Sequence, residues 1–300
     1  MADDLDFTEL RRLRATRPEA VREAAAARIR RPLLGPDGRL MLVAADHPAR
    51  GALGVRGNGA AMADRYDLLR RLATALRRPG VDGVVGTADV LEDLLLLGEL
   101  DSKVAIGSMN RGGLQGSVFE LDDRFTGYDA AGLAAMGFDG GKMLTRIDLD
   151  DSATVSTLEA SANAVSDLAA HQLIAMVEPF LSRRDATGRV VNDLNPAAVA
   201  RSVAIASGLG GTSAYTWLKL PVVPDMAAVM AATTLPALLL GGDPVEHPEE
   251  TYARWRQALA VPGVRGLVVG RALLYPPDGD VAAAVDAAVG LVRADTEVAA

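Results

Sequence analysis

Short runs of consecutive apolar residues recur along this chain, separated by longer segments in which the apolar positions have helical spacing. Each run is bounded by glycine, proline or polar residues, which is typical of a strand buried on both faces. Eight such runs follow one another at intervals of roughly 25 to 40 residues. The expected strands cover residues 40–46, 82–87, 103–108, 138–144, 172–178, 214–220, 236–242 and 264–271.

Helices are predicted in the intervals, from about residues 60–78 after the first strand to about 279–293 after the last. Apolar strands that alternate with helices indicate a parallel sheet covered by helices. Eight such units in about 260 residues fit a closed barrel better than an open sheet. An open doubly wound sheet would carry a glycine fingerprint after its first strand, and residues 46–51 do not match one. The predicted fold class is therefore α/β, a (β/α)8 TIM barrel with an N-terminal helical extension.

The extension, residues 1–36, is rich in arginine and alanine and is predicted to be helical with a break near Pro18. Its arginines indicate either an anionic partner or a solvated face on helices that cover the bottom of the domain or a subunit contact, and the second interpretation is favoured. No linker or low-complexity tract interrupts the pattern that follows. The chain is predicted to be one domain over 1–300, with the barrel over 38–293.

Composition narrows the class of partner. A formal net charge of -8 and a pI near 5.0 argue against nucleic acid or an anionic membrane as the main partner. The absence of cysteine excludes disulfides, a thiolate nucleophile and a cysteine-ligated metal. The first residues lack the apolar segment of a secretory signal, and no apolar run approaches the ~20 residues of a membrane span. We expect a cytoplasmic protein.

Lysine is unusually rare. Of the 31 basic residues only three are lysines, Lys103, Lys142 and Lys219. A deprotonated amine can attack a carbonyl and a guanidinium cannot, so a lysine in an arginine-biased chain suggests this chemistry. Lys219 lies among aromatic and aliphatic residues, where a charged ammonium costs roughly several kcal/mol unless it is paired or deprotonated. The alternative is that the lysines are remnants of the composition.

Polar residues of the expected strands collect at one end. Asp46 ends the first strand, Lys142 lies late in the fourth, Glu178 ends the fifth, and Lys219 lies late in the sixth. In a (β/α)8 barrel the active site lies at the carboxyl ends of the strands. These four residues are therefore the predicted catalytic group. The few polar residues at the opposite ends are expected to reach solvent, namely Asp82 and Lys103.

Alternation of side chains tests which residues face the barrel interior. If Lys219 points inward, then Tyr215 and Trp217 do too, and Leu218 packs under the helices. Inward residues of alternate strands share a layer, so Lys142 and Lys219 are expected to lie within a few ångströms of each other. Like charge and burial both disfavour the ammonium form, so one amine can be neutral while the other stays charged. The alternative is that the two lysines form buried ion pairs with the two carboxylates.

A different signal lies after the last two strands. The segments Gly241-Gly242-Asp243 and Gly270-Arg271 bring exposed backbone N–H groups and a guanidinium together. Barrels commonly bind a phosphate between these two loops, where glycine permits close backbone approach. Taken alone, each motif is weak, because glycine at a strand end is often only a turn. At these two positions, after the seventh and eighth expected strands, a phosphate cradle is the favoured interpretation.

These residues, taken in order, resemble a known group of enzymes, the class I (Schiff-base) aldolases related to archaeal-type fructose-bisphosphate, tagatose-bisphosphate and autoinducer-2 aldolases. The similarity is nearest to an actinobacterial branch associated with inositol catabolism, sometimes labelled deoxyribose-phosphate aldolase. It covers about 38–275 as a series of strand ends. The matching motifs are D-H after the first strand, a lysine in the fourth, E-P after the fifth, W-L-K-L-P in the sixth, L-L-G-G in the seventh and V-V-G-R in the eighth.

The resemblance implies a role for each matching residue. Lys219 would form the Schiff base, Lys142 would assist it, and Asp46 would shuttle protons. Two features depart from the group: Pro48 follows the D-H pair, and Glu178 stands near a position where relatives carry a tyrosine. The choice between the two carboxylates therefore stays open. Phosphate or substrate contacts are expected from His47, Trp217, Gly241, Gly242, Gly270 and Arg271.

The resulting hypothesis is a metal-independent class I aldolase of carbohydrate metabolism that needs no cofactor. Its substrate would be a phosphorylated keto sugar or deoxy-keto acid, and the specific candidates are a deoxyribose-phosphate aldolase-like or a 5-dehydro-2-deoxyphosphogluconate aldolase-like activity. A homo-oligomer is expected by analogy. A catalytically silent barrel that binds a sugar phosphate is the main alternative.

A metal-dependent barrel lyase or hydrolase that uses Asp46, His47, Glu178 and His171 is a weaker alternative. It would need histidines to converge on these carboxylates. His47 follows a strand end, His171 precedes a strand at the bottom of the barrel, and His247 lies in a loop before a helix. Such positions do not readily converge, so no metal site is predicted.

Overall fold

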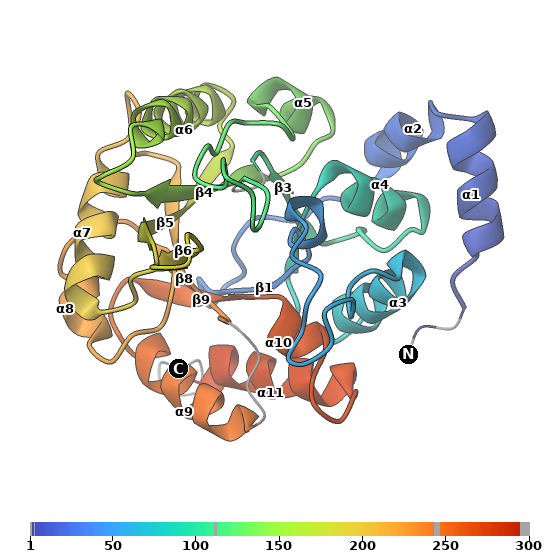
Figure 1. The fold of residues 1–300 in the computed structure, drawn as a ribbon. Helices are drawn as coiled ribbons and strands as arrows, with labels where there is room; N and C mark the ends of the chain where they lie inside the picture. Colours follow the sequence, from blue (N-terminus) through green and yellow to red (C-terminus); the bar gives the residue numbers. More distant parts are fainter. Residues whose placement is uncertain (1, 3, 111–112, 243–246, 295–300) are drawn as a thin grey trace.

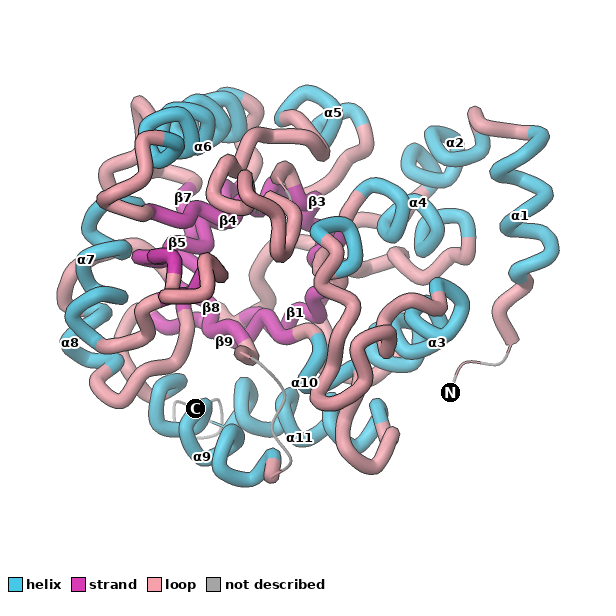
Figure 2. The backbone as a smooth tube through the Cα atoms, viewed as in Figure 1, coloured by secondary structure: helices cyan, strands magenta, loops and turns pink. Residues whose placement is uncertain are grey.

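The computed structural model describes residues 2, 4–110, 113–242 and 247–294, and it has the predicted (β/α)8 architecture. Eight parallel strands pair in the order β4-β3-β2-β1-β9-β8-β7-β5, and pairing of β4 with β5 closes the ring (Figures 1 and 2). No described helix is long and apolar enough to cross a membrane. The strands are β1 (Leu40–Ala44), β2 (Gly83–Gly86), β3 (Val104–Ser108), β4 (Gly140–Ile147), β5 (Ile174–Arg184), β7 (Thr216–Leu220), β8 (Ala237–Leu240) and β9 (Val264–Val269).

Helices surround the ring on its outside (Figure 2). Several begin at an aspartate or asparagine whose side chain accepts backbone N–H groups of the first turn, as Asp64 and Asn195 do. Pro196 follows Asn195 at a position that lacks an intrahelical N–H partner in any case. The helices are α3 (Arg65–Leu76), α4 (Ala88–Leu96), α5 (Ala130–Ala135), α6 (Ala153–Ala170), α7 (Pro196–Ser207), α8 (Met226–Met230), α9 (Pro248–Leu259), α10 (Arg271–Leu274) and α11 (Val281–Arg293).

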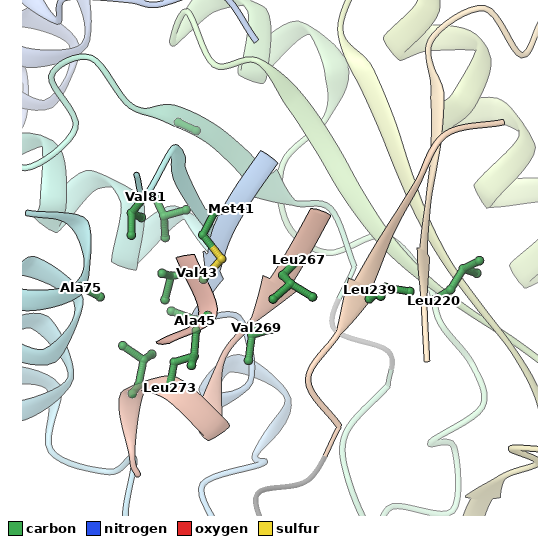
Figure 3. Packing of buried hydrophobic residues seen from close by; sticks show 14 of the residues in the cluster. Met41, Val43, Ala45, Ala75, Val81, Leu220, Leu239, Leu267, Val269 and Leu273 are labelled. Atoms are coloured by element: carbon green, nitrogen blue, oxygen red, sulfur yellow. The ribbon is translucent and has the colours of Figure 1, made fainter. Parts of the chain in front are cut away.

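Side chains of each strand alternate between two apolar layers, as predicted. Outward residues such as Met41 and Val43 pack with Leu267 under the helices (Figure 3). Inward residues form a smaller cluster that includes Leu42 and Trp217. Leu218 and Leu220 belong to the outer layer, so the predicted inward direction of β7 is confirmed. Because adjacent positions point to opposite layers, the polar residues of the inner register converge on the barrel axis.

The strands β4 and β5 extend further than the sequence predicted. Their pairing continues to Ile147 opposite Leu181, so Glu178 lies within β5 rather than at its end, and Lys142 lies early in β4. Pro179 has no backbone N–H and therefore suggested a strand end. The pairing of β5 with β7 stops at Val177, however, so Pro179 lies where β5 has a neighbour on one side and a missing N–H is tolerated. Beyond this point β5 pairs with the short antiparallel strand β6 (Val190–Asn192), which the sequence pattern did not reveal.

Past the end of β3, β4 has no neighbouring strand on that side among the described residues, and the buried side chain of Asn110 bonds to its backbone instead. The Asn110 side chain accepts the N–H of Leu144 and donates to its carbonyl oxygen, both at 2.8 Å. It also donates to the carbonyl oxygen of Asp123, at 3.4 Å. The amide thus ties the long β3–α5 segment to β4, beside the mouth of the barrel.

The N-terminal helices α1 (Phe7–Thr16) and α2 (Ala20–Ala27) lie outside the barrel next to α4, with the break between them close to the predicted place (Figure 1). Their arginines are only partly a solvated face. Arg14 pairs with Glu92 at 2.6 Å and Asp93 at 2.7 Å, both on α4. The buried Arg28 donates to the carbonyl oxygen of Lys103 at 2.7 Å, at the amino end of β3. These contacts fasten the extension to the barrel.

The expectation that Asp82 reaches solvent is wrong. Its side chain is buried, accepts the backbone N–H of Met41 at 2.7 Å, and pairs with Arg31 and Arg293. Two arginines therefore compensate one buried carboxylate at the bottom of the barrel. Lys103 is partly buried and donates to the carbonyl oxygen of Val81 at 2.8 Å.

Gly266 offers a stability test of barrel closure. It pairs with Leu40 at φ +141°, and a Cβ built on it would lie 1.8 Å from the carbonyl oxygen of Leu40. Because that oxygen belongs to the neighbouring strand, we expect Gly266→Ala to lower the free energy of unfolding by about 3 kcal/mol or more. Gly290→Ala is the matched control, since nothing lies within 4 Å of its Cβ position in α11. Urea denaturation of both variants checks this, and equal stabilities would contradict it.

Candidate active site

A cavity of about 370 Å³ opens at the carboxyl ends of the strands, within the size range of small-molecule sites. It contains all but one of the residues that the sequence proposed. Trp217 is the exception, because it packs in the inner apolar cluster below the lysines and is not part of the lining. The predicted residues that line the cavity are Asp46, His47, Lys142, Glu178, Lys219, Gly241, Gly242, Gly270 and Arg271.

Four buried charged side chains form a chain of contacts on the cavity floor. Lys142 Nζ lies 2.8 Å from Asp46 Oδ2 and 2.6 Å from Glu178 Oε2. Lys219 Nζ lies 3.1 Å from the other oxygen of Glu178. Both amines contact one carboxylate, so the two lysines share a layer. The ion pairs are the arrangement that the sequence left as the alternative, and they occur together with the predicted convergence.

The two lysines differ in how strongly their charges are compensated. Burial lowers the pKa of Lys219 below its ordinary value, Glu178 opposes this, and the positive charge of Lys142 adds to the lowering. Burial also acts on Lys142, but the two carboxylates that it contacts outweigh this effect and raise its pKa. One amine is thereby held charged while the other is biased toward the neutral form.

Both carboxylates are ionised at neutral pH. Burial would raise their pKa values, but Lys142 and Lys219 outweigh it, lowering the pKa of Glu178 to about 2 and that of Asp46 well below its usual range. Ser108 Oγ lies 3.5 Å from Asp46 Oδ2. The floor therefore holds two anions, one cation and one amine of lowered pKa.

His47 lies at the edge of this cluster. Its Nδ1 is 3.8 Å from Asp46 Oδ1 and has no hydrogen-bond partner among the described residues. Burial lowers the pKa of His47 to about 3, with Arg271 and Arg50 adding to the effect, so the ring is neutral at neutral pH. The described part of the chain contains no group of three or more histidine and carboxylate side chains placed to hold a metal ion.

The predicted phosphate cradle forms the wall at β8 and β9. Gly242 has φ +66°, a conformation that favours glycine. A Cβ on Gly270 would lie 2.5 Å from the carbonyl oxygen of Ala44 and 3.0 Å from His47 Cε1. Arg271 follows and donates to the carbonyl oxygen of Gly54 at 3.4 Å. Asp243, which the sequence pattern grouped with these glycines, lies outside the described residues.

Three arginines of the cavity wall were not predicted from the sequence, Arg50, Arg146 and Arg254. Arg146 could have been found, because it follows Lys142 by two periods of strand alternation and therefore faces inward. It pairs with Glu120 at 3.0 Å. Arg50 and Arg254 lie on a short helical turn and on α9, where strand alternation gives no signal.

The closed ring of parallel strands makes this protein a (β/α)8 barrel, and its cavity holds a lysine–carboxylate cluster at the carboxyl ends of the strands. The Cgl0159-like family model matches residues 38–289, and the chain belongs to that family. The crystal structure of Cgl0159 from Corynebacterium glutamicum (Brevibacterium flavum) is 58% identical in sequence. The match covers 96% of this chain and 97% of that one, with a TM-score of 0.94.

More distant solved structures share the fold. An archaeal fructose 1,6-bisphosphate aldolase is 20% identical over 91% of this chain and 99% of its own, with a TM-score of 0.64. A Schiff-base-forming fructose-1,6-bisphosphate aldolase is 21% identical over the same shares, 91% and 99%, with a TM-score of 0.63. No curated protein matches the chain. At these identities the likeness establishes the barrel fold.

Proposed function

We propose that this protein is a class I aldolase that makes or breaks a carbon–carbon bond through a Schiff base on Lys219. One observation carries the proposal: a buried lysine of lowered pKa lies in a cavity beside a second lysine whose pKa is raised. Apolar residues would stabilise a barrel interior at less cost than this cluster. An amine with a lowered pKa is the nucleophile that such chemistry requires.

The proposed reaction begins when the lone pair of neutral Lys219 adds to the ketone carbon of the substrate. The carbonyl oxygen takes up a proton, giving a carbinolamine, and loss of water gives an iminium. The iminium then accepts the electron pair of the bond between the α and β carbons as the β-hydroxyl loses its proton and an aldehyde leaves. Protonation of the remaining enamine at carbon and hydrolysis release the ketone and restore Lys219.

The neighbours of Lys219 supply the remaining steps. Asp46 and Glu178 are both ionised at neutral pH, and either can accept the proton of the β-hydroxyl. Lys142 keeps a positive charge beside the nucleophile, which disfavours protonation of Lys219. In this scheme no metal or organic cofactor takes part.

The residues of the cavity wall at β8 and β9 are an argument that the substrate carries a phosphate. Backbone N–H groups at glycines and an arginine guanidinium are the donors that proteins use for phosphate. With Gly242, Gly270 and Arg271 in that wall, the phosphate would be held within the same cavity as Lys219. A phosphorylated keto sugar or deoxy-keto acid fits this proposal, including the substrate of a 5-dehydro-2-deoxyphosphogluconate aldolase. Deoxyribose phosphate, an aldehyde sugar, is the corresponding candidate for a deoxyribose-phosphate aldolase-like activity. Inositol catabolism is the corresponding proposed context.

The test is an intact-mass measurement after borohydride reduction in the presence of phosphorylated ketoses, deoxyribose phosphate and 2-deoxy-5-keto-gluconate phosphate. We expect a stable adduct with at least one phosphorylated compound and none with its dephosphorylated counterpart. Thermal stabilisation by these phosphates with no adduct from any of them would instead support the alternative of a silent sugar-phosphate-binding barrel.

A further inference from the structure

Arg50 is a cavity-lining arginine that forms no salt bridge with any residue that the structure describes. It ends a short helical turn (Pro48–Arg50) after β1 and lines the same cavity as Lys219. Its Nε is buried and has no hydrogen-bond partner within the described part of the chain. A buried polar group without a partner is uncommon and calls for an explanation.

The surroundings place Arg50 beside the β3–α5 segment. Its carbonyl oxygen accepts the N–H of Gln115 at 3.0 Å, and in Figure 1 the blue turn after β1 lies next to the green segment before α5. The charge of Arg50 also acts on Asp123 of that segment. Asp123 in turn pairs with Arg146 of β4, at 3.3 Å. Arg50 therefore follows β1 in the chain but lies against the β3–α5 segment, toward the side of the cavity formed by β3 and β4.

This side lies across the barrel from the phosphate wall. In the closed ring the strands run β4-β3-β2-β1-β9 in one direction and β4-β5-β7-β8-β9 in the other, so β4 is diametrically opposite β9. Gly270 and Arg271 follow β9, whereas Arg146 extends from β4. Lys219, on β7, lies between these two sides along the ring, and Lys142 lies on β4 itself.

The charges of the lining residues are not balanced. The wall carries four arginines and two lysines, against the two carboxylates of Asp46 and Glu178. Those carboxylates are engaged by the lysines, and Arg146 is matched by Glu120 and Asp123. Among the described residues Arg50 has no salt bridge, and the carboxylate on which its charge acts, Asp123, already pairs with Arg146. An anionic group of a ligand would supply Arg50 with both a charge partner and its missing hydrogen bond.

We propose that Arg50 forms a second anion subsite, so that the substrate is a keto compound with an anionic group on each side of the reacting carbon. This rests on the proposed function, because the reacting carbon is the one attacked by Lys219. The first anion is the phosphate at β8 and β9, and the second is a phosphate or carboxylate at β3 and β4. Arg146, already paired, borders this subsite and Arg50 supplies its binding charge.

Two matched pairs of probes test the subsite and distinguish the kinds of anion. Fructose 1,6-bisphosphate is compared with fructose 1-phosphate, and 2-deoxy-5-keto-gluconate 6-phosphate is compared with its methyl ester. Dissociation constants are measured by calorimetry on full-length protein carrying Lys219→Met, which removes turnover. Arg50→Gln is added to this background. Arg124→Gln is the matched control, because Arg124 lies in the same β3–α5 segment with its side chain 79% exposed.

We expect the member with the second anion to bind about 10- to 100-fold more tightly in at least one pair, the range of a charge-assisted hydrogen bond. Arg50→Gln is expected to remove that preference and to change binding of the other member less than about threefold. Arg124→Gln is expected to preserve the preference. An equal loss for both members of each pair, or no preference in protein that retains Arg50, would overturn the subsite.

These outcomes separate this inference from the aldolase proposal. If borohydride traps no adduct on the unmutated protein while the preference for two anions is present and depends on Arg50, the aldolase chemistry fails and the subsite stands. If an adduct forms but neither pair shows a preference, the subsite fails and the aldolase proposal stands.

Discussion

Replacement of Lys219 by methionine is expected to abolish the borohydride-trapped adduct and to lower kcat at least about 10⁴-fold with the substrate that gives the adduct. Methionine has a similar length but no lone pair that can attack a carbonyl. The other amine that contacts Glu178 is Lys142, whose raised pKa keeps it protonated and therefore unreactive. Intact mass and a coupled assay for the released aldehyde measure both effects.

Lys103→Met is the matched control for that experiment. Lys103 lies at the amino end of β3, on the opposite side of the barrel from the cavity, and donates to the carbonyl oxygen of Val81. We expect this variant to retain the adduct and activity within a few-fold. Full activity in Lys219→Met would remove the basis of the aldolase proposal, whatever Lys103→Met does.

Lys142→Met is expected to shift the pH dependence of the reaction as well as its rate. The neutral Lys219 amine reacts, so kcat/KM rises with pH through the pKa of Lys219, which burial and the charge of Lys142 hold below the roughly 10.4 of an unperturbed lysine. Without Lys142 the carboxylates of Asp46 and Glu178 face Lys219 uncompensated, and its pKa rises. The ascending limb then moves to higher pH, and activity near pH 7 falls by about 100-fold or more.

Lys142→Arg separates this charge effect from lost packing. An arginine keeps the positive charge beside Lys219, so the ascending limb is expected to stay near its original position even where the rate falls. Measurement of kcat/KM across pH 5 to about 10.5 compares the variants. An unchanged limb in Lys142→Met would mean that Lys142 does not control the protonation of Lys219.

The barrel was predictable because one physical rule governs most of the chain. Strands buried on both faces must be apolar throughout, and each must be followed by a helix that covers its outer side. The inward direction of Lys219 followed from period-two alternation, and Leu218 and Trp217 occupy the expected layers. The convergence of Lys142, Glu178 and Asp46 followed from their positions at the same end of a parallel barrel.

What escaped prediction depends on contacts between distant segments. The extension of β5 past Pro179 is permitted because β7 has ended beside it, a fact that no local pattern contains. The Asn110 amide supports β4 across the gap left by β3, and this too is a tertiary contact. Trp217 was expected at the substrate because it shares the inward face of β7, but its place deeper in the barrel puts it in the apolar core.

The sequence predicted that the two lysines can differ in protonation, but it did not predict the contacts that cause the difference. Proximity of the two lysines implied that one amine can be neutral, but the sequence did not show that Glu178 contacts both of them. That shared carboxylate opposes the lowering of the pKa of Lys219 and helps to raise that of Lys142. The pKa of Lys219 is lowered because burial and the charge of Lys142 together exceed the effect of Glu178.

The rarity of lysine makes this balance directly measurable. Protein labelled with ¹³C at the lysine ε carbon would give three side-chain resonances, which Lys103→Met, Lys142→Met and Lys219→Met assign. A pH titration followed by NMR is expected to show Lys219 losing its proton below the roughly 10.4 of an ordinary lysine and Lys142 keeping its proton above that value. A Lys219 resonance that titrates at or above the ordinary value would contradict the claim that this amine is prepared to act as the nucleophile.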